Sequence, residues 1–189
     1  MSDKADYNIY LFGETSVKAY EIMIRFVQGI YPSKYDPTVN DIPQIKKVPI
    51  KNKEVAVEII DGSCSISLPT AFELFVHQAD GIALVYSITN YSSFDLIKDL
   101  IPQLNALLKG KPVRTMVIGV NSTQESNRVV PFNEGKQFAD SIGALFEEMD
   151  AKAEVNVNAG MYNLIQAVVA DKKESKKETS FFKKIFKKK

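Results

Sequence analysis

The segment 13–20 has the spacing of a loop that could hold phosphate groups. Such a loop follows the pattern G-x-x-x-x-G-K-[ST]: glycines let backbone N–H groups surround the phosphates, a lysine neutralises their charge, and a hydroxyl binds Mg²⁺. The segment keeps the first glycine as Gly13. The other specified positions hold, in order, Lys18, Ala19 and Tyr20. Three side chains remain as candidates for phosphate contact: Thr15, Ser16 and Lys18.

Strand and helix patterns alternate along the chain and must position this loop. Short apolar runs predict six strands, at 7–12, 45–50, 55–60, 81–88, 113–120 and 144–149. Helical periodicity predicts helices after residue 13 and at 69–78, 92–108, 131–142 and 159–170. Pro102 is expected to bend or break the helix at 92–108. The short polar link at 51–53 predicts an antiparallel hairpin.

This order of elements predicts an α/β domain. Its six-stranded sheet should be mostly parallel, with one antiparallel edge hairpin and helices on both faces. Ligands of such sheets bind at the carboxyl ends of the strands. The residues that follow Phe12, Ile60, Val120 and Met149 should therefore surround any ligand site.

The order of elements resembles the Ras branch of the small GTPases over residues 7–170. A second feature supports the resemblance, because Tyr35-Asp36-Pro37-Thr38 begins 22 residues after Gly13, as the effector loop does in that family. The resemblance implies a P-loop, small-GTPase-like fold. It also implies that Thr38 would sense Mg²⁺ and the γ-phosphate, and that an effector-type protein would bind through residues 35–45.

The nucleotide motifs of that family are only partly present here. The segment 61–65 occupies the position of the family motif Asp-x-x-Gly-Gln. Likewise, 121–124 occupies the position of Asn-Lys-x-Asp, and 150–152 that of Ser-Ala-Lys. The family residue is kept at Gly13, Thr38, Asp61, Asn121, Ala151 and Lys152. It is replaced at Lys18, Ala19, Tyr20, Cys64, Ser65, Ser122, Gln124 and Asp150.

Because the replacements fall on all four nucleotide loops while the strands keep their apolar runs, we expect a degenerate member of the family. Such a pseudo-GTPase would be a signalling adaptor or decoy with no catalytic residue, no cofactor and no metal site. We also expect Tyr20 or another side chain to fill the nucleotide's place. One alternative is a divergent working GTPase that binds GTP or GDP with Mg²⁺ through Lys18 and Thr15 or Ser16. Another is a domain that binds a different nucleotide without hydrolysis.

Charge is divided unevenly along the 189 residues, whose net charge is +1. Residues 172–189 hold nine lysines and two glutamates, or +7, which leaves −6 for residues 1–171. We therefore expect a Ras-like domain at 1–171 and a polybasic, aromatic-containing tail at 172–189. The single cysteine, Cys64, fits a reducing cytoplasmic compartment. It also leaves no cysteine in the tail for a lipid anchor.

The end of the tail has two faces if it is placed on a helix at about 100° per residue. One face, about 140° wide, is apolar and holds Phe181, Phe182, Ile185 and Phe186. The opposite face holds Lys183, Lys184, Lys187 and Lys188. This pattern favours peripheral binding to anionic lipid on the inner face of a membrane. A solubilising tail and a targeting signal stay open as other uses, and a nucleic-acid partner is not expected.

Overall fold

The computed structural model describes the backbone of residues 4–32 and 42–186, and side chains as far as residue 173. Its six-stranded sheet has the order β2-β3-β1-β4-β5-β6. All neighbouring strands are parallel except the hairpin β2–β3. The predicted fold class is therefore confirmed. The strands are β1 (Tyr7–Gly13), β2 (Gln44–Ile50), β3 (Lys53–Asp61), β4 (Gly81–Ser87), β5 (Arg114–Val120) and β6 (Leu145–Met149).

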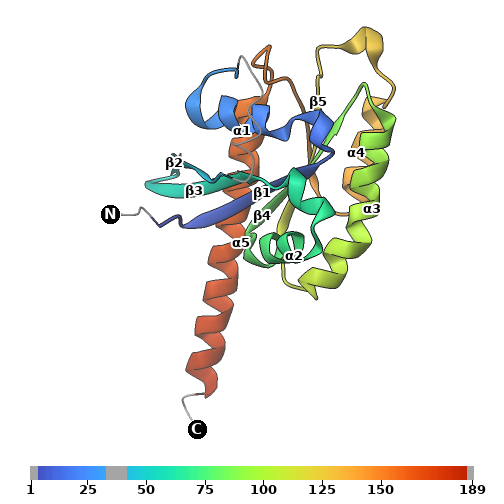
Figure 1. Ribbon diagram of the computed structural model, residues 1–189. Coiled ribbons are helices and arrows are strands. Elements are labelled where there is room, and N and C mark those ends of the chain that lie inside the picture. Colours follow the sequence, from blue (N-terminus) through green and yellow to red (C-terminus); the bar gives the residue numbers. More distant parts are fainter. Residues whose placement is uncertain (1–3, 33–41, 187–189) are drawn as a thin grey trace.

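Helices cover both faces of the sheet (Figure 1). The α-helices are α1 (Ala19–Gln28), α2 (Pro69–Gln78), α3 (Tyr91–Leu108), α4 (Phe132–Ser141) and α5 (Val157–Phe186). Short 3-10 helices among the described residues lie in loops: η1 (Thr15–Val17), η3 (Ser63–Ser67) and η4 (Glu125–Asn127). One apolar core lies between the sheet and α1 and α5, and the other lies between the sheet and α2, α3 and α4.

Alternation along β1 explains how one strand serves both cores. Ile9 and Leu11 point into the core beneath α1 and α5. Tyr10 and Phe12 point into the opposite core. Side chains in a strand alternate between faces, so a central strand covered on both faces is apolar over most of its length. β4 is covered in the same way, because all seven of its residues are buried.

The helix α3 runs without a break through Pro102, so the break considered from the sequence is not found. Proline removes one backbone hydrogen bond from a helix, which leaves the carbonyl four residues earlier without its partner. Pro102 is exposed to solvent. Water can therefore hydrate the carbonyl of Lys98, and the rest of the helix stays paired.

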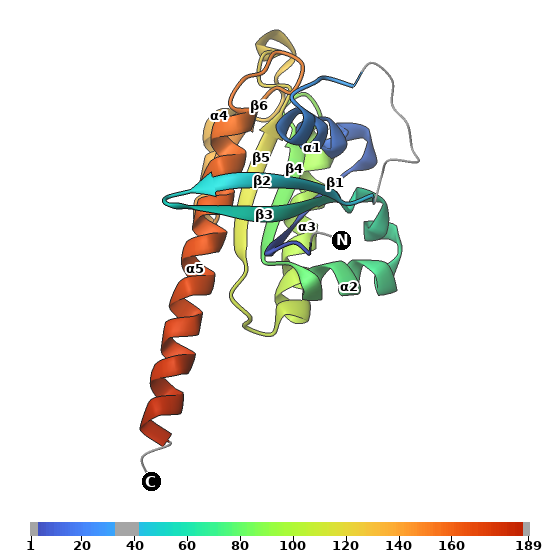
Figure 2. The ribbon, with the colours of Figure 1, turned by 90° about the vertical axis from the view of Figure 1, so that its left-hand side faces the viewer.

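The last helix, α5, is much longer than the predicted 159–170. It begins at Val157 and continues to Phe186. Figures 1 and 2 show it extending past the sheet toward the C-terminus. The boundary expected at residue 171 between domain and tail thus lies inside one continuous helix. Within the described residues, no helix combines the length and apolar character needed to cross a bilayer.

Two ion pairs hold α5 where it leaves the domain. The Arg114 guanidinium donates hydrogen bonds of 2.9 and 2.8 Å to the two carboxylate oxygens of Asp171. The Lys172 ammonium lies 2.9 Å from Asp80 Oδ1. The same ammonium lies 4.7 Å from the centre of the Tyr7 ring. The direction of the helix is thus fixed by contacts to the start of β5, to the residue before β4 and to the start of β1.

Candidate functional site

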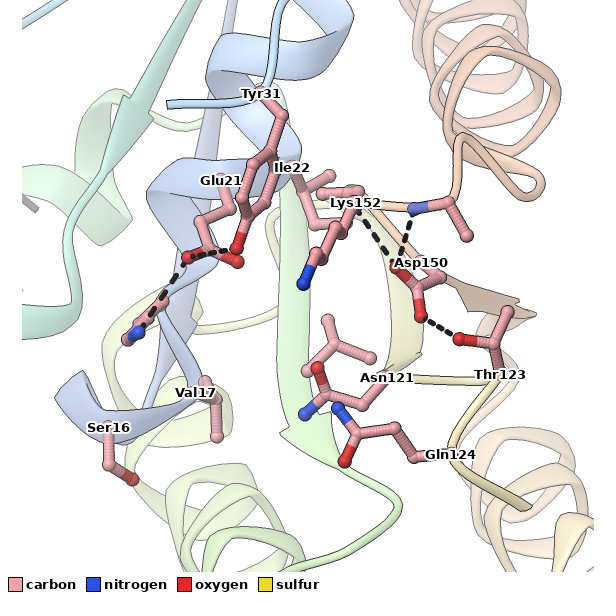
Figure 3. Close-up of a pocket in the computed structure, with 14 residues that line it drawn as sticks. Ser16, Val17, Glu21, Ile22, Tyr31, Asn121, Thr123, Gln124, Asp150 and Lys152 are labelled. Atoms are coloured by element: carbon pink, nitrogen blue, oxygen red, sulfur yellow. Dashed lines mark hydrogen bonds and ion pairs between the residues drawn. The ribbon is translucent and has the colours of Figure 1, made fainter. Parts of the chain in front are cut away.

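A cavity of about 740 Å³ opens at the carboxyl ends of the strands, where the sequence predicted a ligand site (Figure 3). Its walls come from η1 and α1, from the segment after α1, and from the loops after β5 and β6. Its volume lies within the range of small-molecule sites. The lining residues are Ser16, Val17, Lys18, Glu21, Ile22, Tyr31, Val120, Asn121, Thr123, Gln124, Asp150, Ala151, Lys152 and Ala153.

This region has two parts. The phosphate side comprises residues 13–20 and 61–65, which stand where the Ras-like pattern places its phosphate and Mg²⁺ contacts. The base side comprises residues 121–124 and 150–153, which stand where the same pattern reads the base.

The first loop of the phosphate side packs against itself. Residues 15–17 form the 3-10 helix η1, and Val17 is 6% exposed. A Cβ atom added to Gly13 would lie 2.3 Å from the Val85 carbonyl oxygen and 3.1 Å from a Val17 methyl. Gly13 is therefore required by packing alone. Lys18 stands at the family's second glycine and adopts the left-handed conformation that favours glycine, with φ of 54°.

Tyr20 does not fill the cavity, so this prediction is wrong. Its side chain is 2% exposed and belongs to the core beneath α1 and α5. The reason is its place in α1, because an aromatic ring on the buried face of an amphipathic helix gains more from apolar contact than from a polar cleft. Ala19 beside it is 1% exposed and belongs to the same core.

The two carboxylates of the phosphate side bind groups of this chain. Asp61 is 3% exposed, and its Oδ1 accepts hydrogen bonds from the Ser63 backbone N–H at 3.0 Å and the Ser63 hydroxyl at 2.6 Å. The Glu14 carboxylate accepts a hydrogen bond of 3.2 Å from the Asn90 side-chain amide. Neither Asp61 nor Glu14 lines the cavity.

On the base side, Asn121 begins the loop after β5 in a left-handed conformation, with φ of 64°. Its side-chain amide donates a hydrogen bond of 2.9 Å to the Ser87 hydroxyl at the end of β4. This contact ties the loop to the neighbouring strand. Asparagine is among the residues that tolerate this backbone conformation best, which gives Asn121 a structural role whether or not a ligand is present.

Asp150 joins the two base-side loops. Its Oδ1 accepts hydrogen bonds from the backbone N–H groups of Lys152 at 3.0 Å and Ala153 at 2.9 Å, and its Oδ2 accepts one from the Thr123 hydroxyl. Burial raises the pKa of this carboxyl. The hydrogen bonds from Thr123, Ala153 and Lys152 outweigh burial, and the resulting pKa lies below its ordinary value. Asp150 is therefore a bound carboxylate that holds the cavity wall together.

A buried ion pair between Arg128 and Glu148 stabilises the base side. Arg128, just after η4, donates two hydrogen bonds of 2.8 Å to the carboxylate of Glu148 on β6. The Glu148 side chain is 9% exposed. Arg128 also pairs with Glu125, whose side chain is 70% exposed. The bidentate pair fixes the loop after β5 to the edge strand of the sheet.

A third wall of the cavity comes from α1 and the residues after it. The Tyr31 hydroxyl donates a hydrogen bond of 3.1 Å to Glu21. Burial, followed by the Glu21 charge, raises the pKa of Tyr31. The Lys18 ammonium lies 3.8 Å from the same carboxylate. The Arg25 guanidinium donates a 2.8 Å hydrogen bond to the Ala151 carbonyl, which joins this wall to the base side.

Two polar groups point into the cavity without a partner. Figure 3 shows the Gln124 amide and the Lys152 ammonium directed toward the same space. Within the described part of the chain, neither group has a hydrogen bond or an ion pair. These are the groups that a bound molecule would meet first.

The structure brings together some of the predicted site residues and separates others. Ser16, Lys18, Asn121, Ala151 and Lys152 line the cavity, whereas Gly13, Thr15 and Asp61 do not. The effector-like residues Tyr35, Asp36, Pro37 and Thr38 lie outside the described residues. The backbone of 181–186 is described as helix, but the tail side chains and all of Lys187 and Lys188 also lie outside.

Sequence reasoning missed Glu21, Tyr31 and Thr123 as parts of the site. Glu21 and Tyr31 fall outside every motif, and only the turn of the chain after Gly29 brings them together. Thr123 could have been suspected from the sequence, since its side chain carries a hydroxyl and lies in the loop expected to contact a base. Its partner Asp150 lies 27 residues further along the chain.

The side chains on the phosphate side do not fit a magnesium-bound triphosphate in their present arrangement. Ala19 and Tyr20 lie in the core, and Asp61 is bonded to Ser63. Mg²⁺ requires a nearly octahedral set of oxygen ligands. Among the described residues, no group of three or more His, Cys, Asp or Glu is placed to hold a metal ion.

Comparison with known proteins agrees with the fold and with the order of the loops. A sequence model described as the Ras family matches residues 8–170. The match covers both sides of the cavity and every strand from Asn8 onward. It extends over far more than half of the 189 residues, and the chain belongs to the Ras family.

Proposed function

We propose that this Ras-family chain is a pseudo-GTPase, a small-GTPase-like adaptor or decoy in signalling that does not hydrolyse GTP. One observation carries the proposal. Positions that would contact phosphate and Mg²⁺ are occupied by side chains engaged within the chain: Ala19 and Tyr20 lie in the core, and Asp61 Oδ1 accepts two hydrogen bonds from Ser63. Hydrolysis needs charge stabilisation and an oriented water at those positions.

The proposed protein partner binds through residues 35–45, of which 42–45 are described and lead into the edge strand β2. β2 is an edge strand, and Ile42 and Ile45 near its start are 45% and 42% exposed. An exposed strand edge can receive a strand from another protein. Without a γ-phosphate to order the loops, the partner would bind constitutively rather than in a cycle.

The proposed second partner is anionic lipid, at the inner face of a membrane and reached from the cytoplasm. The support comes from the sequence of the tail and from the backbone of α5, which is helical to Phe186. A helical backbone over 181–186 places the apolar and lysine positions of that range on separate faces. Each lysine close to an anionic surface contributes about 1 kcal/mol.

The first test is the nucleotide content of the full-length protein. The purified chain is denatured and its supernatant is separated by anion-exchange chromatography. The native chain is then titrated with fluorescent GTP and GDP in the presence of Mg²⁺. We expect no guanine nucleotide in the supernatant and no binding at about 100 μM, since several charge-assisted contacts of about 1.5–3 kcal/mol each are missing. Copurified GDP or GTP would overturn the proposal and favour the divergent working GTPase.

The second test is sedimentation with lipid vesicles. We expect the chain to sediment with vesicles that contain phosphatidylserine and to stay in solution with neutral phosphatidylcholine vesicles. Replacing Lys183, Lys184, Lys187 and Lys188 by glutamine should abolish sedimentation. The same number of changes on the domain surface, at Lys47, Lys53, Lys109 and Lys136, serves as the matched control. Equal sedimentation with neutral vesicles would remove the membrane part of the proposal.

A further inference from the structure

Another cavity, of about 550 Å³, lies between the tip of the β2–β3 hairpin, one side of α5 and the strands β5 and β6. We call it the α5 cavity. In Figure 2 the hairpin tip overlaps α5, and residues of both line this space. Among the described residues, it has no lining residue in common with the cavity at the carboxyl ends of the strands. Its volume is in the range of small-molecule sites, and it is a separate candidate for a bound molecule.

The inner surface of the α5 cavity is apolar. Ile50, Met116 and Val169 line it and are 4%, 2% and 2% exposed, because they belong to the core beneath α1 and α5. Ala167 and Ala170 on α5 also line it, and their small side chains leave the space beside this core open. An apolar group placed there would leave water and meet apolar side chains, which is favourable.

The α5 cavity is elongated along the helix. Its lining positions on α5 run from Asn163 to Lys173, which is about 15 Å at 1.5 Å per residue. They recur at spacings of three and four residues, so they lie on one side of the helix. A single extended chain lying beside α5 fits this arrangement better than a ring or a pair of chains.

The charge of the α5 cavity is positive. Within the described part of the chain, both charged residues of its lining are lysines, Lys51 at the hairpin tip and Lys173 on α5. The cavity at the carboxyl ends of the strands instead has two lysines and two carboxylates. An ammonium group forms strong, charge-assisted hydrogen bonds with a carboxylate, whereas it repels a cation. A ligand of the α5 cavity should therefore be anionic at one end and apolar along its length.

We propose that the α5 cavity binds a single-chain fatty acid, with the alkyl chain along Ala167 and Ala170 and the carboxylate attracted by Lys51 and Lys173. The helix α5 continues from Lys173 toward the basic tail, for which an anionic membrane surface is proposed. Fatty acids partition into such surfaces, so the charged end of the cavity faces their source. The inference goes beyond the proposed function, because it holds whether or not a nucleotide binds.

The test is isothermal titration of the full 189-residue chain with dodecanoate, kept below the concentration at which it forms micelles. We expect one dodecanoate to bind per chain. Hexanoate has the same carboxylate but a shorter chain, and should bind weaker by about tenfold or more. Dodecyltrimethylammonium has the same chain but the opposite charge, and should also bind weaker by about tenfold or more. Equal binding of dodecanoate and either of these probes would overturn the inference.

A pair of lysine substitutions tests the charged end. Lys51→Gln combined with Lys173→Gln should weaken dodecanoate binding by about tenfold or more, and both positions are exposed, so the fold should be kept. Lys109→Gln combined with Lys136→Gln is the matched control and should leave the affinity unchanged. Lys109 shares the left-handed backbone of Lys51, with φ of 48° and 55°, and Lys136 is an exposed helical residue, as Lys173 is.

A substitution on α5 tests the apolar part. Ala170→Phe places a ring in the space assigned to the alkyl chain and should abolish dodecanoate binding. Ala159→Phe, at an exposed position of the same helix outside the cavity, is the control and should bind dodecanoate normally. Circular dichroism checks that each variant is folded. Unchanged binding in either the double lysine variant or Ala170→Phe would overturn the inference.

The tail variant from the vesicle test separates this inference from the proposed function. With its four lysines replaced by glutamine, the chain should still bind dodecanoate with unchanged affinity. If it does not, the ligand binds the tail, and the inference falls while the membrane proposal stands. If dodecanoate does not bind, yet the tail variant still sediments with phosphatidylserine vesicles through Lys51 and Lys173, the ligand is a membrane lipid. The inference then falls together with the assignment of membrane binding to the tail.

Discussion

Polar side chains on the phosphate side and on the base side differ in the contacts that they make. On the phosphate side, Asp61 and Glu14 accept hydrogen bonds from Ser63 and Asn90, and neither faces the cavity. On the base side, Asp150 accepts hydrogen bonds from Thr123, Lys152 and Ala153, yet the side chains of Gln124 and Lys152 point into the cavity. The acidic groups of the phosphate side are thus bonded within the domain, while Ser16, Val17 and Lys18 of the same side line the cavity together with the base side.

If the contacts around the base side keep the cavity open, loss of the Arg128–Glu148 ion pair should have the largest effect on stability. Arg128→Met leaves the Glu148 carboxylate buried without a partner, and we expect the free energy of unfolding to fall by about 3–5 kcal/mol. Urea denaturation followed by circular dichroism measures the change. Glu125→Gln removes the exposed partner of the same arginine and should cost far less, because water solvates this carboxylate. Similar losses in the two variants would contradict the assigned roles.

Asp150→Ala should be the next largest change, because it removes the acceptor shared by Thr123, Lys152 and Ala153. We expect a loss of about 2–4 kcal/mol at pH 7. The pKa of Asp150 is lower in the folded state than its ordinary value of 3.8. Its stabilisation is therefore complete above that value and is lost as the pH falls through the folded-state pKa.

The measurement for Asp150→Ala is a series of urea denaturations from pH 7 to pH 2. The difference between the unmodified chain and the variant should begin to shrink below pH 3.8. Lys152→Ala, which removes an exposed side chain beside the same carboxylate, should show no such trend. A difference that stays constant over the series would mean that the charge of Asp150 does not contribute.

The smallest expected effect lies on the phosphate side. Ser63→Ala removes one of two hydrogen bonds from Ser63 to the buried Asp61 carboxylate, and we expect a loss of about 1–2 kcal/mol in urea denaturation. Ser67→Ala, at an exposed position in the same 3-10 helix, should change stability by no more than about 0.5 kcal/mol. If Ser63→Ala left stability unchanged, the Asp61–Ser63 contact would not be a structural one, and the contrast between the two sides would weaken.

The fold could be predicted almost completely from apolar patterns. The run at 81–88 could only be a strand covered on both faces, and the helix predicted at 69–78 has the bounds of α2. The local sequence pattern gave wrong helix continuity or helix bounds where these depended on exposure to solvent or on tertiary contacts. Pro102 does not interrupt α3 because its neighbourhood is open to water. The helix α5 continues past residue 170, where Asp171 and Lys172 bind Arg114 and Asp80, which are distant in sequence.

The site was harder to predict, because comparison with a motif asks which residue stands at a position and not what it binds. Asp150 counted as a replacement, yet it accepts three hydrogen bonds that join the two base-side loops. Tyr20 was expected to fill the nucleotide's place, but its position on the buried face of α1 decided its environment. Asp61 keeps the family residue, yet its Oδ1 accepts hydrogen bonds from Ser63 and it does not line the cavity.

The unbroken course of α5 makes the angular position of the tail a property of the domain. Residues 172–186 add about 22 Å of helix beyond the Arg114–Asp171 pair, at 1.5 Å per residue. Each residue also turns the helix by about 100°. Inserting one residue after Lys173 would therefore rotate the face that holds Phe181 away from its original heading, whereas inserting seven would nearly restore it. The continuous helix therefore fixes the rotational orientation of the basic end relative to the domain.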